Sequence, residues 1–219
     1  MISSESSFKS WLNEHRQLLL LSVMGVFLPI GIFIFLALGI ARQPEGFPWD
    51  VPILLFIHTE ARSQLDIFAA TLTQFGIYWG VVPLIIAIAV TLSFQKKWRA
   101  IIYLFITAVG TAIISHTSKL YFHRVRPSLW EHFYPLPPDF SFPSGHALSS
   151  MMLFVTLIIL TWGTRWFAAV LFIGSFFVLG IGWTRLYLGV HYPTDILGGW
   201  MLAIAWSIGV SLIVKPNKL

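Results

Sequence analysis

The chain has 219 residues, of which 57% are hydrophobic and 11% charged, and its mean hydropathy is +0.79. In water-soluble domains about a quarter of all residues are charged. The composition therefore excludes a soluble globular protein and indicates a membrane protein. The formal net charge of +5 does not indicate nucleic-acid binding, because the basic residues are not clustered, and the absence of cysteine excludes disulfides and thiolate metal sites.

Five segments lack Asp, Glu, Lys and Arg and are long enough to cross a bilayer, which takes about 20 residues. They are residues 17–41, 100–118, 147–164, 166–184 and 196–214. A further uncharged stretch, 67–95, is too long for one span, and we divide it near Gly76 into an interfacial or partial helix and a span over 78–94. The pattern predicts an all-α integral membrane bundle of six transmembrane helices, with residues 1–219 forming one domain.

The first segment is expected to remain in the protein as a span. Its apolar run is longer than the roughly 7–15 residues of a signal-peptide core, although "GIA" at 39–41 offers a small-x-small cleavage site.

The distribution of Lys and Arg predicts the orientation. With a cytoplasmic N-terminus, the inner side carries Lys9, Arg16, Lys96, Lys97, Arg99, Arg165, Lys215 and Lys218. The outer side carries Arg42, Arg62, Lys119, Arg124, Arg126 and Arg185. Three of the outer residues are assigned to a binding site below, which strengthens the bias. We therefore expect both termini in the cytoplasm.

Polar residues gather in three stretches: "SHTSKLYFHRVRP" (115–127), "PSGHALSS" (143–150) and "WTRLYLGVHYPTD" (183–195). Counting the spans places all three at one membrane face, which is the extracytoplasmic face in this orientation. The side chains that would meet there are Lys119, Arg126, His146, Arg185, His191 and Asp195. A single Lys or Arg at a helix end usually only snorkels to the interface. Gathering this whole set at a bilayer edge is costly unless its members share a ligand.

A phosphate group fits these cations. Lys119, Arg126 and Arg185 would repel one another without an anion, and a phosphate monoester carries about −1.5 to −2 charges near neutral pH. Arginine offers a planar fork for two phosphate oxygens, and lysine acts as a point charge. The sequence therefore predicts a phosphate site.

The stretch "PSGH" would complete this site at the start of a span. Pro143 suits the beginning of a helix, the hydroxyl of Ser144 suits a helix cap, and Gly145 lets an anion approach the backbone. The free N–H groups of the helix N-terminus would face that anion, and His146 would lie beside it.

His191 precedes Asp195 by four residues, and Pro193 between them suits the first position of the last span. A carboxylate so placed accepts the Nδ1 proton of the imidazole and leaves Nε2 free to attack. Two histidines in different roles suit acid–base chemistry near neutral pH. We see no carboxylate cluster for Mg²⁺, and the scheme needs no metal and no cofactor.

The motifs K-x6-R-P from Lys119, "PSGH" and T-R-x5-H-x3-D from Thr184 resemble the type-2 phosphatidic acid phosphatase superfamily. That superfamily includes bacterial membrane lipid phosphatases, such as phosphatidylglycerophosphatase B, glucose-6-phosphatase and the vanadium haloperoxidases. The motifs cover residues 119–195, and the six-span layout extends the likeness over nearly the whole chain. Thr184 departs from the family's usual serine but keeps the hydroxyl.

The resemblance implies a division of roles. Lys119, Arg126, Ser144, Gly145 and Arg185 would bind phosphate. His191 would form a phosphohistidine, Asp195 would orient it, and His146 would protonate the leaving oxygen and then act as base. The implied protein is a lipid phosphatase in the plasma membrane of a bacterium, whose partners are its lipid phosphate substrate and the bilayer.

Candidate substrates are phosphatidate, phosphatidylglycerophosphate and a polyprenyl pyrophosphate. Gly145 stands where dedicated polyprenyl pyrophosphatases of this family often have aspartate, which slightly disfavours the last of these, and broad specificity for several lipids is an alternative. A phosphotransferase using an alcohol in place of water, and an anion transporter, remain alternatives. Analysis of the products distinguishes a phosphotransferase from a hydrolase. An anion transporter predicts polar residues at the membrane midplane, whereas the polar residues here lie at one rim.

Four other features have weaker assignments. His116 is expected to be a neutral, hydrogen-bonded residue, with a role in the site as the alternative. His123 and Arg124 are expected to be solvated at the rim, with contact to the lipid headgroup as the alternative. The loop "SLWEHFYPLPPDF" is expected either to cover the site or to form an aromatic interfacial belt.

Overall fold

The computed structural model describes residue 16 and residues 18–43, 46–131 and 133–217. Lys9, Lys218, the position where the first predicted span begins and the N-terminus itself lie outside the described residues. Within the described part every regular element is helical. The elements are η1 (Val23–Phe27), α2 (Leu28–Arg42), α3 (Asp50–His58), α4 (Ser63–Gln74), α5 (Val81–Phe94), α6 (Trp98–Phe122), α7 (Gly145–Thr161), α8 (Phe167–Tyr187) and α9 (Pro193–Val214).

Four helical stretches of the described residues are long and apolar enough to cross a membrane: Leu18–Arg42, Trp98–Phe122, Phe167–Tyr187 and Pro193–Val214. Each coincides with a predicted span to within a few residues. The other two predicted spans coincide with the shorter apolar helices Val81–Phe94 and Gly145–Thr161. The structure thus confirms an all-helical membrane protein and places a helix at each of the six predicted spans.

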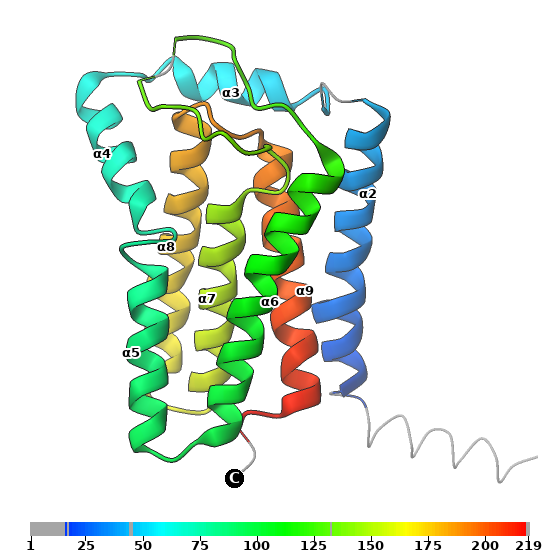
Figure 1. Cartoon of the computed structure of the whole chain (residues 1–219), viewed down its shortest axis with the longest axis vertical. Coiled ribbons are helices and arrows are strands. Elements are labelled where there is room, and N and C mark those ends of the chain that lie inside the picture. Colours follow the sequence, from blue (N-terminus) through cyan, green and yellow to red (C-terminus); the bar gives the residue numbers. More distant parts are fainter. Residues whose placement is uncertain (1–15, 17, 44–45, 132, 218–219) are drawn as a thin grey trace, which may run out of the picture.

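The stretch between 67 and 95 divides where the sequence indicates. Helix α4 ends at Gln74 and α5 begins at Val81, and the two stack end to end along one side of the bundle (Figure 1). Helix α4 packs on α8, and α5 packs on α6 and α7. Of the two interpretations of the segment before Gly76, the structure therefore supports a partial helix, which extends the bundle.

Helix α7 lies at the centre of the bundle, where it packs against α6, α8 and α9. The approach of α9 is very close: a Cβ added at Gly199 would lie 2.9 Å from the Ser144 carbonyl oxygen and 3.2 Å from the Leu148 nitrogen. Glycine at this position is required because any side chain would separate the two helices. The beginnings of α7 and α9 are thereby held side by side.

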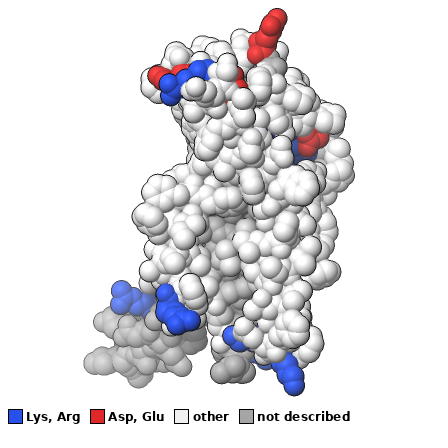
Figure 2. All heavy atoms as spheres, turned by 90° about the vertical axis from the view of Figure 1, so that its left-hand side faces the viewer, with Lys and Arg blue, Asp and Glu red and all other residues white. Residues whose placement is uncertain are grey.

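One end of the bundle is covered by polar connections. Helix α3 and the connection between α6 and α7 cross this end, where α6 and α8 finish and α7 and α9 begin (Figure 1). Exposed acidic residues, among them Glu60, Glu131 and Asp139, occur at this end. The opposite end carries the exposed basic residues Lys96, Lys97, Arg99, Arg165 and Lys215. Figure 2 shows this separation, with Lys and Arg alone at the lower end and no charged side chain across the middle of that face.

Apolar side chains cover the outside of the bundle between its two ends. Phe35, Phe105, Phe172 and Phe176 are each at least 62% exposed, and they come from α2, α6 and α8. Such large exposed phenylalanines are costly in water and stable in lipid.

Candidate active site

Two predicted phosphate ligands, Lys119 and Arg126, converge on a single carboxylate. Lys119 near the end of α6 donates to one oxygen of Asp139 at 2.6 Å, and Arg126 donates to the other at 2.5 Å. Both cations also donate to main-chain carbonyl oxygens of this loop, Lys119 to Phe140 and Arg126 to Asp139. The Asp139 side chain itself is 52% exposed. The two cations are thus already arranged to hold two oxygens of one anion at the mouth of the site.

Arg126 also contacts His191, whose imidazole is buried. One guanidinium nitrogen of Arg126 lies 3.0 Å from Nε2 of His191 and 2.7 Å from the Val190 carbonyl oxygen. Arginine has no acceptor, so this contact requires Nε2 to accept and Nδ1 to carry the proton. The tautomer is the one that a nucleophilic Nε2 needs.

Asp195 holds the other side of that imidazole. Nδ1 of His191 lies 3.3 Å from the carboxylate of Asp195, which also accepts from the Tyr192 backbone N–H at 2.8 Å and from the Ser141 hydroxyl. Asp195 is the third residue of α9, where its carboxylate caps the helix, and Pro193 begins the helix as predicted. The i,i+4 spacing and the helix start together fix His191 relative to Asp195.

The third predicted cation, Arg185, lies near the end of α8 and is fully buried. Its guanidinium donates to the Thr73 hydroxyl of α4 at 2.7 Å and lies 5.6 Å from the centre of the Tyr134 ring. Its Nε has no hydrogen-bond partner among the described residues. A buried charged donor left without an acceptor is costly, and a bound anion would supply the missing acceptor.

The "PSGH" stretch forms the start of α7. Ser144 is the N-cap, and its hydroxyl accepts from the Ala147 N–H at 3.5 Å, as predicted for this serine. A Cβ added at Gly145 would meet only the Ser115 hydroxyl within 4 Å, at 3.4 Å, so space remains beside the helix N-terminus. His146 follows in the first turn, and Gly76 from the break between α4 and α5 approaches its ring.

The electrostatics tie these elements together. Burial, followed by the positive charges of Arg126, Arg185 and Lys119, lowers the pKa of His191 well below its usual value. His146 interacts electrostatically with the same three cations and with His191. Side chains from α6, α7, α8 and the start of α9 therefore share one electrostatic site. Its excess of positive charge suits an anionic ligand.

Three acidic or polar participants were not predicted from the sequence. Asp139 bridges two of the cations, Thr73 supports Arg185, and Asp50 at the start of α3 contacts Arg124 at 2.8 Å. No local spacing links any of them to a motif. Asp139 alone offered a signal, as an acid four residues before the "PSGHALSS" stretch.

Arg124, expected at the solvated rim, is fully buried, and this prediction was wrong. His123 is exposed at the rim as expected, where its ring lies against Phe140. His116 is exposed on the outer surface of α6, so it does not face the site.

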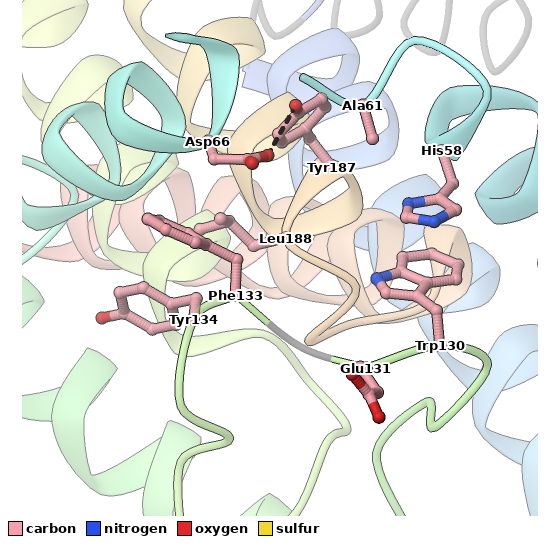
Figure 3. Close-up of a pocket in the computed structure, with 9 residues that line it drawn as sticks. All are labelled: His58, Ala61, Asp66, Trp130, Glu131, Phe133, Tyr134, Tyr187 and Leu188. Carbon is pink, nitrogen blue, oxygen red and sulfur yellow. Dashed lines mark hydrogen bonds between the residues drawn. The ribbon is translucent and has the colours of Figure 1, made fainter. Parts of the chain in front are cut away.

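A cavity of about 110 Å³ lies beside the site, between α3, α4, the end of α8 and the loop after α6 (Figure 3). It is lined by His58, Ala61, Asp66, Trp130, Glu131, Phe133, Tyr134, Tyr187 and Leu188. The rings of His58 and Trp130 stack with centroids 3.9 Å apart, and Asp66 accepts from the Tyr187 hydroxyl at 2.8 Å. Through Trp130, Phe133 and Tyr134 the loop predicted as a cover or a belt forms one wall of this cavity.

Comparison with known proteins gives consistent similarities. The chain is 28% identical over 196 residues to the undecaprenyl-diphosphatase of Sulfolobus acidocaldarius, covering 88% of this chain and 89% of that protein. It is 29% identical over 141 residues to phosphatidylglycerophosphatase B of Bacillus subtilis, covering 61% and 67%.

Among solved structures, the crystal structure of a transmembrane PAP2 type phosphatidylglycerolphosphate phosphatase from Bacillus subtilis superimposes with a TM-score of 0.72. The identity is 25%, and the match covers 87% of this chain and 97% of that one. The PAP2 superfamily itself matches residues 99–219, which is more than half of the chain and includes all three motifs. The chain belongs to the PAP2 superfamily.

Proposed function

We propose that this chain is an integral membrane lipid phosphatase of six transmembrane helices, which removes the terminal phosphate of a lipid phosphate through a phosphohistidine on His191. The relatives named as phosphatases support a lipid phosphate hydrolase. The division of roles among the site residues rests on the geometry described above and on the family motifs.

One observation carries the proposal. Lys119 and Arg126 already grip one oxyanion, the carboxylate of Asp139, and Arg126 simultaneously touches Nε2 of His191. A substrate phosphate that replaces this carboxylate would be bound by the same donors within reach of Nε2. The unpaired Nε of Arg185 would supply a further donor, since phosphate offers more acceptor oxygens than a carboxylate.

The first chemical step forms a phosphoenzyme. The lone pair of His191 Nε2 attacks phosphorus, the bond from phosphorus to the leaving oxygen breaks, and its electron pair stays on that oxygen. The protonated ring of His146 donates a proton to this oxygen, which leaves as an alcohol or as a lipid monophosphate. Asp195 stabilises the positive ring of His191 through Nδ1.

The second step regenerates the enzyme. Neutral His146 takes a proton from a water molecule as its oxygen attacks phosphorus, and the N–P bond breaks with its electron pair returning to Nε2 of His191. Lys119, Arg126 and Arg185 stabilise the charge on the phosphoryl oxygens in both steps. Inorganic phosphate is released, and His146 is left protonated for the next turnover.

The orientation follows the charge distribution. Exposed Lys and Arg gather at the end opposite the site, as expected for a cytoplasmic end, so both termini would be cytoplasmic and the site extracytoplasmic. A membrane substrate would keep its tail in the bilayer while its phosphate reaches the rim between helices. The names of the relatives keep both polyprenyl diphosphates and phosphatidylglycerophosphate as candidates.

A substrate panel tests the proposal. Purified full-length protein in detergent would be incubated separately with phosphatidate, phosphatidylglycerophosphate and a polyprenyl diphosphate, and released phosphate would be measured. His191→Ala provides the inactive control. Release from at least one lipid by the wild type alone supports the proposal, and no release from any of them contradicts it.

A further inference from the structure

Arg124 lies between two buried carboxylates from opposite parts of the chain. It donates to Asp50 at the start of α3 at 2.8 Å and to Asp195 in the first turn of α9 at 2.6 Å. All three side chains are 0% exposed. An arginine fork can bind two separate carboxylates through its two terminal nitrogens, which the single ammonium of lysine reproduces poorly.

Asp50 is held by several donors. Besides Arg124 it accepts from the Thr194 backbone N–H at 3.0 Å, from the Thr194 hydroxyl at 2.7 Å and from the Phe47 N–H at 3.1 Å. Thr194 directly precedes Asp195, and its hydroxyl also accepts from Arg124 at 2.7 Å. Asp50 therefore fixes both Arg124 and the first turn of α9.

This network decides how Asp195 presents its carboxylate. Arg124 occupies one oxygen, and the other oxygen faces His191, Ser141 and the Tyr192 N–H. With one oxygen anchored by a charged hydrogen bond, the carboxylate cannot rotate its second oxygen away from the imidazole. Charged hydrogen bonds of this kind are stronger than neutral ones and restrict geometry.

The charges point to the same role. Asp50, Asp195 and Arg124 together carry one net negative charge, and it lies on the Nδ1 side of the His191 ring, whereas Arg126 lies on the Nε2 side. His191 becomes positively charged when its Nε2 bonds to phosphorus. The negative charge on the Nδ1 side therefore stabilises the positive ring of the phosphoenzyme.

We infer that Arg124 and Asp50 are positioning residues for the reaction: Asp50 anchors Arg124, and Arg124 holds Asp195 in the orientation that keeps His191 ready to attack. The inference rests on the proposed function. Because Arg124 is completely buried, it cannot contact a lipid headgroup, and the inference gives it a different role.

The test is a double-mutant cycle on kcat with purified full-length protein and the best lipid of the substrate panel. Arg124→Met removes the charged contacts, and Asp195→Asn removes the charge through which Arg124 is inferred to act. Arg42→Lys, an exposed arginine at the same end of the bundle, is the matched control. Thermal unfolding of every variant monitors folding, and wild-type release of phosphate tests the proposed function separately.

Removal of the outer partners that orient the ligands of metal sites typically lowers activity about 10–100-fold, and Arg124 stands in a comparable position behind Asp195. We expect Arg124→Met to lower kcat by that factor with little change in KM, and to have almost no further effect when Asp195→Asn is already present. If its full effect persists in the Asp195→Asn protein, or if KM rises while kcat is unchanged, the inference is overturned.

Asp50→Asn provides a second route if Arg124→Met does not fold. The substitution keeps the shape of the side chain and removes the charge that anchors Arg124. A fall in kcat that vanishes in the Asp195→Asn background supports the inference, and an unchanged kcat for Asp50→Asn overturns it.

Discussion

The guanidinium of Arg126 lies 3.0 Å from Nε2 of His191, and the same guanidinium binds the carboxylate of Asp139. A residue that binds an anion is thus in direct contact with the atom proposed to attack it. An oxyanion held by Arg126 needs no long-range movement to reach the imidazole. This proximity is what effective nucleophilic catalysis requires.

His191→Ala should abolish phosphate release while the protein still inserts and folds. Because the substitution removes the attacking atom, we expect kcat to fall by at least about 10³-fold. The measurement is phosphate release by purified protein, with His123→Ala, an exposed histidine at the same rim, as the control. Comparable turnover by the His191→Ala and wild-type proteins would refute the assignment of the nucleophile.

Asp139→Asn should strengthen the binding of phosphate. The carboxylate of Asp139 competes for the donors of Lys119 and Arg126. Burial raises the pKa of Asp139, but the hydrogen bonds and charges of Lys119 and Arg126 outweigh it and lower the pKa to about 2. It is therefore ionised, and competes, throughout the neutral range. We expect a severalfold lower inhibition constant for inorganic phosphate, with Glu131→Gln, an exposed acid of the same loop, as control. A higher inhibition constant would show that Asp139 organises the two cations for the ligand.

The same lowered pKa has a consequence for stability. Because the folded-state pKa of Asp139 lies below its unfolded value of 3.8, its ion pairs stabilise the protein above that pH. This stabilisation is lost as the pH falls from about 4 towards 2. Thermal unfolding across this range should show a smaller decline for Asp139→Asn than for the wild type. Equal declines in the two proteins would contradict the expectation.

On the acidic side of the pH profile, kcat/KM should begin to fall only below the usual titration range of histidine, which centres on about pH 6.5. Burial and the cations lower the pKa of His191 and keep Nε2 unprotonated there. In the unfolded chain this group takes up a proton near pH 6.5, so it also disfavours the folded state as the pH falls below that value.

The measurement is kcat/KM against pH for the wild type and for Asp139→Asn. The negative charge of Asp139 raises the pKa of His191. Removing this charge in Asp139→Asn should therefore move the acidic fall of kcat/KM to lower pH. The ionisation of the lipid phosphate is common to both proteins, and the difference between the profiles belongs to the enzyme. A shift of this fall to higher pH would contradict this account.

Arg185→Lys should weaken catalysis although it preserves the charge. Lysine cannot supply the planar fork or the Nε donor that has no partner among the described residues. Loss of one well-placed donor to a transition state typically costs about 10²–10³-fold in rate, and we expect a fall of that order in kcat/KM. Arg42→Lys again serves as control. If Arg185→Lys has the kcat/KM of the wild type, the Nε of Arg185 does not contact the phosphate.

Activity should persist in EDTA, because the three cations of the protein itself supply the positive charge that the phosphoryl group needs. Vanadate, which adopts the five-coordinate geometry of the transition state, should inhibit under the same conditions. Phosphate release is again the measurement. Loss of activity in EDTA that added Mg²⁺ restores would contradict the mechanism.

The parts of this site that could be predicted from the sequence are those encoded by local spacing. His191 and Asp195 are four residues apart across the start of α9, Ser144 directly precedes a helix, and span counting brings the three motifs to one end. The contacts of Asp50 and Thr73 could not be predicted, since they join residues 144 and 112 positions apart. The burial of Arg124 depends on α3 crossing the start of α9, and hydrophobic periodicity carries no signal for that crossing.

The most direct test of the central claim is to locate the phosphoryl group during turnover. Wild-type protein would be mixed with its best lipid phosphate, quenched in alkali within the first turnover, digested and analysed by mass spectrometry. The account predicts phosphate on the imidazole of His191, labile to acid and absent from the Asp195→Asn protein or strongly reduced there. Phosphate on another residue, or direct hydrolysis that leaves no phosphoenzyme while lipid is consumed, would contradict it.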